Sequence, residues 1–173
     1  MPDWTILPFI SGIPHFDSLT YEEMISQACD PEASSANRIG AFFEVLRRNN
    51  VNYDSLCIAS VLLDCDSLDV RTETVYAICI GFSQGRIDLN SFVDTTAIVA
   101  EVIEKLRNEP VEALRPAALM ARLALGDESA KDDAQQIANA HPIIELANGR
   151  AKNELIRVAH SICTGSLKPV KLV

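Results

Sequence analysis

The chain has 173 residues, of which 48% are hydrophobic and 23% charged, and its formal net charge is −9. A chain of this size can bury a core of its own, and its composition excludes wholesale disorder, so we expect one domain over residues 1–173. The acidic balance excludes general binding to nucleic-acid phosphates and suits a basic protein partner, although such a balance is also ordinary for a soluble protein.

Residues 1–17 form an apolar lead segment that contains prolines and large side chains such as Trp4 and Phe9. Asp3 stands where a signal peptide would carry basic residues, and the prolines interrupt any membrane span. We therefore expect a protein without a membrane anchor. The lead segment is predicted to pack across the ends of the helices, or else to dock on a partner or on a second copy of the chain.

Capping residues and apolar periodicity predict helices along the rest of the chain. Thr20 and Glu23 have the spacing of a capping box and mark the first helix. Pro116 is expected to kink or restart a helix near Arg115. The predicted helices cover about 21–29, 35–50, 53–63, 68–84, 88–108, 110–125, 129–140 and 142–164, followed by a short basic tail, 166–173.

The five cysteines are an odd number, stand in apolar helical stretches and form no C-x-x-C pair. They are interpreted as reduced core thiols, which favours the cytoplasm. The three histidines are far apart in the sequence, so no metal site is expected. No phosphate-binding glycine motif is present either, and no cofactor is expected.

Two segments, 53–81 and 96–126, repeat a helix-hairpin pattern at a spacing of forty-four residues. Val70, Arg71, Thr74 and Ala77 of the first segment correspond to Leu114, Arg115, Ala118 and Ala121 of the second. A period of this size is typical of stacked helix pairs, which offer a long surface for binding.

These residues resemble the HEAT-repeat and armadillo-like helical families. The resemblance covers the central part of the chain and implies an arginine that braces the turn between repeats, often against an acidic residue of a neighbouring repeat. Arg71 and Arg115 would then have structural roles. The first and last helix pairs depart from the pattern, and Pro116 directly follows Arg115. The predicted fold is therefore all-α, with about seven or eight helices, either as an irregular helical bundle or as a short HEAT-like α-solenoid.

The segment Gly81–Gly85 matches G-x-S-x-G and resembles the nucleophile elbow of α/β-hydrolases. A serine hydrolase would use Ser83 as nucleophile and His141 or His160 as base, with Asp127, Asp132 or Asp133 orienting the base. The context argues against this alternative, because residues 85–88 indicate a turn where an elbow needs a helix, and alternating strands are missing.

The interpretation that we favour is a non-enzymatic protein-interaction module with an acidic surface. Two corresponding turns carry its candidate contact residues, Asp64, Asp66, Asp69, Glu109 and Glu112. The chain would serve either as an adaptor subunit or as an inhibitor that neutralises a basic toxin or nuclease. The third alternative is self-assembly through the lead segment, with Trp4 and Phe9 as contacts.

Overall fold

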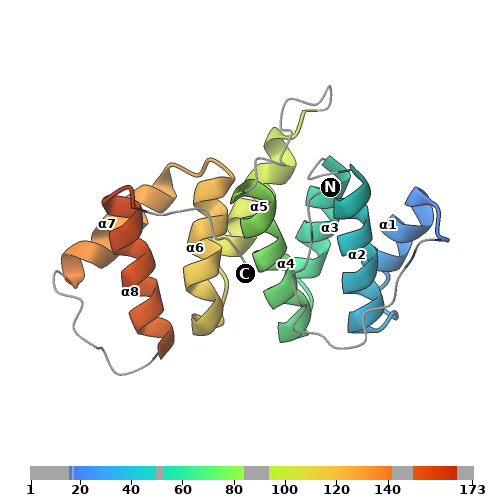
Figure 1. Cartoon of the computed structure of the whole chain (residues 1–173), viewed down its shortest axis with the longest axis horizontal. Coiled ribbons are helices and arrows are strands. Elements are labelled where there is room, and N and C mark those ends of the chain that lie inside the picture. Colours follow the sequence, from blue (N-terminus) through green and yellow to red (C-terminus); the bar gives the residue numbers. More distant parts are fainter. Residues whose placement is uncertain (1–15, 17, 50–52, 84–93, 142–149, 167–173) are drawn as a thin grey trace.

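The computed structural model describes residues 16, 18–49, 53–83, 94–141 and 150–166. Within these residues the chain forms eight α-helices and one short 3₁₀ helix, η1, and no β-strand, which confirms the predicted all-α class (Figure 1). The helices are α1 (Tyr21–Cys29), α2 (Ser35–Asn49), α3 (Tyr53–Leu63), α4 (Leu68–Ser83), α5 (Thr96–Arg107), η1 (Glu112–Leu114), α6 (Arg115–Ala124), α7 (Ser129–Ala140) and α8 (Arg150–Cys163). None of these helices combines the length and hydrophobicity needed to cross a membrane.

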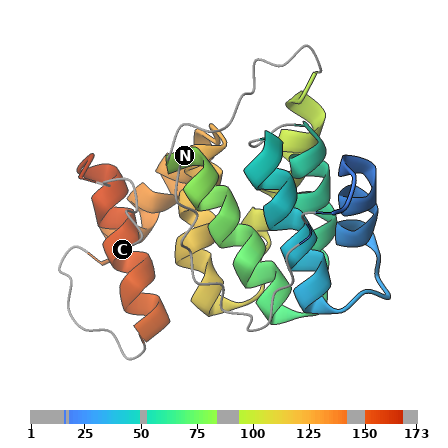
Figure 2. The same ribbon diagram turned by 45° about the vertical axis from the view of Figure 1, so that its right-hand side comes forward.

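The helices are stacked as pairs in chain order: α1 with α2, α3 with α4, α5 with α6, and α7 with α8. Corresponding helices of successive pairs also pack on each other, so that α1, α3 and α5 form one layer and α2, α4, α6 and α8 form the other. Figures 1 and 2 show the resulting elongated row. This arrangement is that of a short α-solenoid, in which each pair buries its apolar face against its neighbours.

Local capping explains where several helices begin. At α1 both bonds of the predicted capping box are present: the Glu23 backbone N donates to Thr20 Oγ1 at 3.3 Å, and the Thr20 backbone N donates to Glu23 Oε2 at 2.8 Å. Ser34 accepts a hydrogen bond from the backbone N of Asn37 and caps α2. Pro116 lies in the first turn of α6, where its missing N–H is tolerated, so the predicted restart near Arg115 is confirmed.

The fifth predicted helix begins later in the structure than the sequence suggests: it was expected from about residue 88, but residues 94 and 95 are not helical and α5 begins at Thr96. The start of the last helix, predicted at Pro142, lies outside the described residues, which resume at Arg150 within α8. The tail over 167–173 is likewise not described. α6 ends at a left-handed Gly126, with φ of 82°, which suits a glycine at a helix C-terminus.

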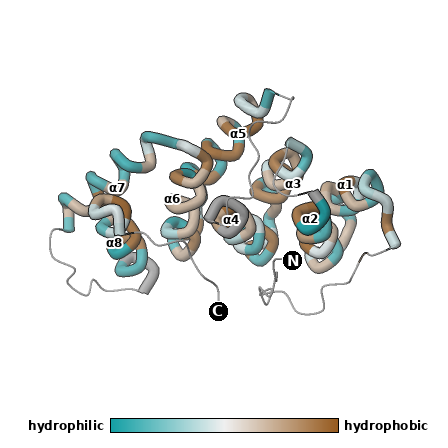
Figure 3. Tube along the Cα trace, turned by 45° about the horizontal axis from the view of Figure 1, so that its top comes forward, coloured by the Kyte–Doolittle hydropathy of each residue, from teal (hydrophilic) through white to brown (hydrophobic). Residues whose placement is uncertain are grey.

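Two apolar clusters hold the stack together. The larger cluster connects α1 to α6 and contains fully buried side chains such as Phe42 and Leu62. The smaller one joins α6, α7 and α8 around Leu119, Ala134 and Val158. α7 is largely hydrophilic (Figure 3), packs on α6 and α8, and makes at most marginal contact with α5. It therefore leaves the layer that α1, α3 and α5 form.

The cysteines fit the predicted core role only in part. All five are free thiols, and Cys79 is buried and donates a hydrogen bond to Ala117 O at 3.1 Å. Burial raises the pKa of Cys79 to about 12. Cys163 is exposed near the end of α8, so the prediction of a core position is wrong for this residue. Cys163 is the last residue of α8, one turn beyond the buried Ala159, so its exposure comes from its place at the helix end.

Candidate functional site: an acidic edge above a ladder of arginines

The turn between α1 and α2 is tied to the turn between α3 and α4 by Arg38. This side chain is buried; its Nε donates to Ala28 O at 3.1 Å, and its Nη1 donates to Cys65 Sγ at 3.2 Å. One arginine therefore satisfies a carbonyl at the end of α1 and reaches the next turn. The sequence analysis did not single out Arg38, although it occupies the fourth position of α2 just as Arg71 occupies the fourth position of α4.

Arg71 repeats this connection one pair further along. Its Nη1 donates to Cys65 O at 2.7 Å and to Asp66 O at 3.2 Å, and its Nε lies 3.4 Å from Glu109 Oε2. Glu109 Oε1 in turn accepts from the backbone N of Val111 at 3.0 Å. Arg71 thus braces its own turn and holds the turn after α5, which is the kind of contact that the resemblance to HEAT-like repeats implies.

Glu109 was predicted to lie on the exposed acidic surface, and this placement is wrong. Only 5% of the residue is accessible, because its carboxylate turns inward to Arg71 and to the Val111 backbone. A carboxylate buried in this way stabilises the turn and is not available to a partner. Counted forty-four residues back, Glu109 corresponds to Cys65, so each is contacted by the arginine of the preceding pair.

A second connection between the pair α3–α4 and the pair α5–α6 is polar and more exposed. Lys105 Nζ lies 2.6 Å from Asp64 Oδ2 and 3.0 Å from Glu101 Oε1, and it donates to Ser60 Oγ at 2.7 Å. Ser60 Oγ also contacts the Glu101 carboxylate. This cluster links α3 to α5 and partly neutralises Asp64.

The proximity of Ser60 and Lys105 superficially resembles the serine–lysine pairs of some hydrolases. Partial burial lowers the pKa of Lys105, but the hydrogen bonds to Asp64 and Glu101 outweigh this effect and raise the pKa above its usual value. The lysine therefore stays protonated and cannot accept a proton from the serine. Ser60 is also buried, so this cluster has the properties of a structural connection.

Above these connections, the outer side of the turns is acidic. Asp64, Asp66, Asp69 and Glu112 are all exposed, as the sequence analysis predicted. In the part of the chain that the structure describes, the side chains of Asp66, Asp69 and Glu112 form no ion pair. Glu32, on the neighbouring turn between α1 and α2, is also exposed. We call Glu32, Asp64, Asp66, Asp69 and Glu112 the acidic edge.

The structural role predicted for Arg115 is wrong. Arg115 is exposed, and within the described residues its side chain makes no hydrogen bond or ion pair. The reason is its position: Arg71 is the fourth residue of α4, whereas Arg115 is the first residue of α6, because the connection before α6 includes the 3₁₀ turn. The buried arginine of this pair is Arg122, two turns further along the same face of α6, which was not predicted from the sequence.

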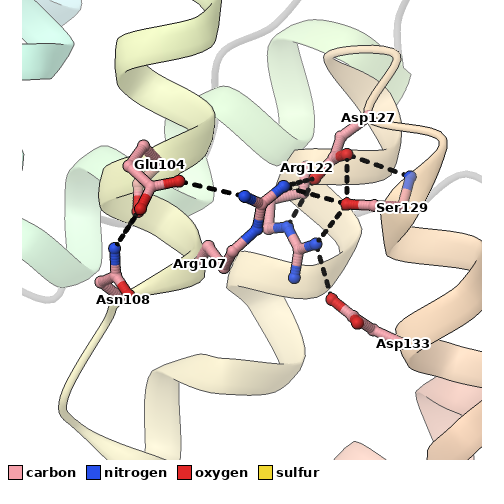
Figure 4. A network of polar contacts seen from close by, with 7 residues as sticks. All are labelled: Glu104, Arg107, Asn108, Arg122, Asp127, Ser129 and Asp133. Atoms are coloured by element: carbon pink, nitrogen blue, oxygen red, sulfur yellow. Dashed lines mark hydrogen bonds and ion pairs between the residues drawn. The ribbon is translucent and has the colours of Figure 1, made fainter.

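Arg122 forms the centre of the polar network between α6 and α7 (Figure 4). Its Nε donates to Asp127 Oδ2 at 2.8 Å and its Nη2 donates to Asp133 Oδ2 at 2.7 Å. Burial raises the pKa of Asp127, but hydrogen bonds from Ser129 and Arg122 outweigh it and hold that pKa below its usual value. Arg107 reaches the same carboxylate from α5 at 3.4 Å.

The residues of the hydrolase alternative are not arranged as that alternative requires. Ser83 is the last residue of α4, and the residues before it are helical, so the strand that leads into a nucleophile elbow is absent there. His160 Nε2 lies 2.7 Å from the backbone carbonyl O of His141, so the His160 ring is bound to the chain at the end of α7. Of the candidate acids, Asp127 and Asp133 bind Arg122, and Asp132 is exposed.

The remaining predictions concern the lead segment and metals. Trp4 and Phe9 lie outside the described residues, so their role as contacts stays a prediction. Among the residues with described positions, no cluster of histidine, cysteine and acidic side chains could hold a metal ion. No protein-family model, curated protein or solved structure matches this chain significantly.

Proposed function

We propose that the chain is a non-enzymatic protein-interaction module, and that its acidic edge binds a basic protein partner. Such a module would act as an adaptor subunit or as an inhibitor that neutralises the basic partner. The observation that carries this proposal is that the basic side chains on the inner side of the turns are already bound, whereas carboxylates on the outer side have no counter-ion among the described residues.

On the inner side, the basic groups are already engaged. Arg38 and Arg71 bind backbone carbonyls and the next turn, and Lys105 binds Asp64 and Glu101. On the outer side, the carboxylates of Asp66, Asp69 and Glu112 have no counter-ion within the described part of the chain. Together with the exposed Glu32 on the turn between α1 and α2, these carboxylates face solvent on three successive turns and provide a negative surface that attracts a positive one.

Charge of this kind affects association in a recognisable way. Long-range attraction between exposed charges increases the association rate and weakens as salt rises, because the screening length falls to about 8 Å at physiological ionic strength. A partner held by the acidic edge should therefore bind more weakly at high salt. Reversal of the charges on these turns should also weaken the binding of this partner.

The test is an affinity pull-down from native extract at low and high salt, with mass spectrometry of the bound proteins. The variant Asp66→Lys/Glu112→Lys reverses two charges of the acidic edge. The control Asp132→Lys/Glu154→Lys reverses two exposed charges on α7 and α8, so both variants have the same net charge. We expect a basic protein that is retained at low salt by the wild type and the control, and that is lost with the edge variant.

Two results would contradict the proposal. One is binding of the same partners by the edge variant and the wild type. The other is equal loss of binding in the edge variant and the control, which would show that net charge, and not the acidic edge, governs the association. Circular dichroism of all three proteins establishes that each is folded.

A further inference from the structure

A groove with a volume of about 410 Å³ opens beside the turn between α5 and α6, where α7 leaves the layer of α1, α3 and α5. It is bounded by the end of α5, one face of α6, the middle of α7 and a residue of α8. In a regular stack the first helix of the next pair would pack on α5, and the groove is the space that results from the departure of α7.

The lining combines apolar and basic side chains. Ile137 and Leu155, which are half-buried, provide apolar surface, and the buried side chains of Leu106 and Leu119 also line the groove. Three arginines, Arg107, Arg115 and Arg122, also line the groove, in a chain whose formal net charge is −9. A small number of charged groups among apolar ones is the usual composition of a site that recognises an amphipathic ligand.

The three arginines differ in whether their charge is available. Arg122 is bound by Asp127 and Asp133, and Arg107 is bound by Glu104 and Asp127 (Figure 4). Asp133 also lines the groove, but its charge is compensated by Arg122 at 2.7 Å. Arg115 is exposed and unpaired among the described residues, so its guanidinium is the group that can receive a ligand.

We propose that this groove binds a short segment of a protein partner that carries a carboxylate beside a large apolar side chain. The Arg115 guanidinium has two parallel N–H donors, which match the geometry of a carboxylate. The half-buried Ile137 and Leu155 receive the apolar side chain. The volume suits two or three side chains and is too small for an entire helix. Arg115 follows Glu112 of the acidic edge by three residues, but the groove selects the opposite charge.

The carboxylate has two sources in a protein, an acidic side chain or the chain terminus, and three peptides distinguish them. They are acetyl-Leu-Ala-Leu with a free C-terminus, the same peptide as an amide, and acetyl-Leu-Glu-Leu amide. Binding to the full chain is measured by NMR titration. We expect at least one carboxylate peptide to shift the amide resonances of the groove, with the neutral amide binding at least about fivefold more weakly.

Variants at two exposed arginines make the test specific. Arg115→Gln removes the unpaired charge of the groove, whereas Arg157→Gln removes an exposed charge on α8 that does not line it. We expect about tenfold weaker binding for Arg115→Gln, in accordance with the loss of a hydrogen bond between charged groups, and no change for Arg157→Gln.

Three outcomes would overturn the proposal. The first is the absence of groove shifts with both carboxylate peptides at millimolar concentration. The second is equal affinity of the wild type and Arg115→Gln. The third is binding of inorganic phosphate as tight as that of the peptides, which would reveal a simple anion site without use of the apolar walls.

Discussion

The buried contact between Arg71 and Glu109 leads to a quantitative prediction about stability. In Glu109→Ala, the Arg71 side chain, of which 13% is exposed, loses its only carboxylate among the described residues. The backbone N–H of Val111 also loses its acceptor. Removal of one partner from a buried ion pair costs about 3–5 kcal/mol. Arg71 keeps two carbonyl partners and the ion pair is long at 3.4 Å, so we expect a value near the lower limit, about 3 kcal/mol.

For a chain of this size, about 3 kcal/mol lowers the melting temperature by roughly 6–12 °C. The assay is thermal and urea unfolding followed by circular dichroism, with Glu112→Ala as the control, because Glu112 is exposed and unpaired in the described structure. The control should remain within about 0.5 kcal/mol of the wild type.

A double-mutant cycle isolates the ion pair from its surroundings. Arg71→Met and Glu109→Leu are combined, and their coupling energy should be at least about 1 kcal/mol. The reasoning is refuted if Glu109→Ala is no more destabilising than Glu112→Ala, or if the two substitutions of the cycle are additive. Either result would mean that the buried carboxylate does not hold the two turns together.

Three further predictions concern the α6–α7 junction and the thiols. Arg122→Met leaves Asp133 without its ion-pair partner and the buried side chain of Asp127 with only Arg107 at 3.4 Å, and it should destabilise the protein by about 3 kcal/mol, whereas Arg115→Gln should be neutral in the same urea titration. The pKa of Asp127 is lower in the folded protein than its usual value of 3.8. The charged carboxylate therefore stabilises the fold above pH 3.8, and this contribution is lost as the pH falls through the folded pKa. Asp127→Asn should flatten the decrease in melting temperature below about pH 4. In native protein, Cys163 should react quickly with a thiol reagent and Cys79 only on unfolding; equal rates would contradict the described burial.

Local sequence signals predicted the helices well because their physical causes are local. The capping box at Thr20 and the apolar periodicity specify the first helix over 21–29, and the helices over 53–63 and 129–140 also have the predicted bounds. The forty-four-residue period correctly relates α3 to α5 and α4 to α6, which pack on each other. Periodicity reports which helices are equivalent, and this is enough to indicate a stack.

The same period was misleading for individual side chains. Arg71 and Arg115 are equivalent by count, yet the 3₁₀ turn before α6 moves Arg115 to the helix start and makes Arg122 the buried arginine. Glu109 was assigned to the surface from its charge, but its environment depends on Arg71, which is far away in sequence. Charge and spacing cannot determine which carboxylates are turned inward, because tertiary contacts decide it. Of the predicted acidic surface, the positions at 64, 66, 69 and 112 are exposed.

The division of the core into two clusters has a consequence for how the molecule opens. In the described structure α7 and α8 pack on the third pair, through the small apolar cluster with α6, through η1 and through the ion pairs of Arg122, so they form a terminal unit that can detach while the first three pairs stay folded. Hydrogen exchange should then be faster in α7 and α8 than in α3 and α4. The groove at Arg115 exists only while this unit is packed on α6. A ligand that binds in the groove therefore stabilises the packed state, and its binding would slow the hydrogen exchange of α7 amides.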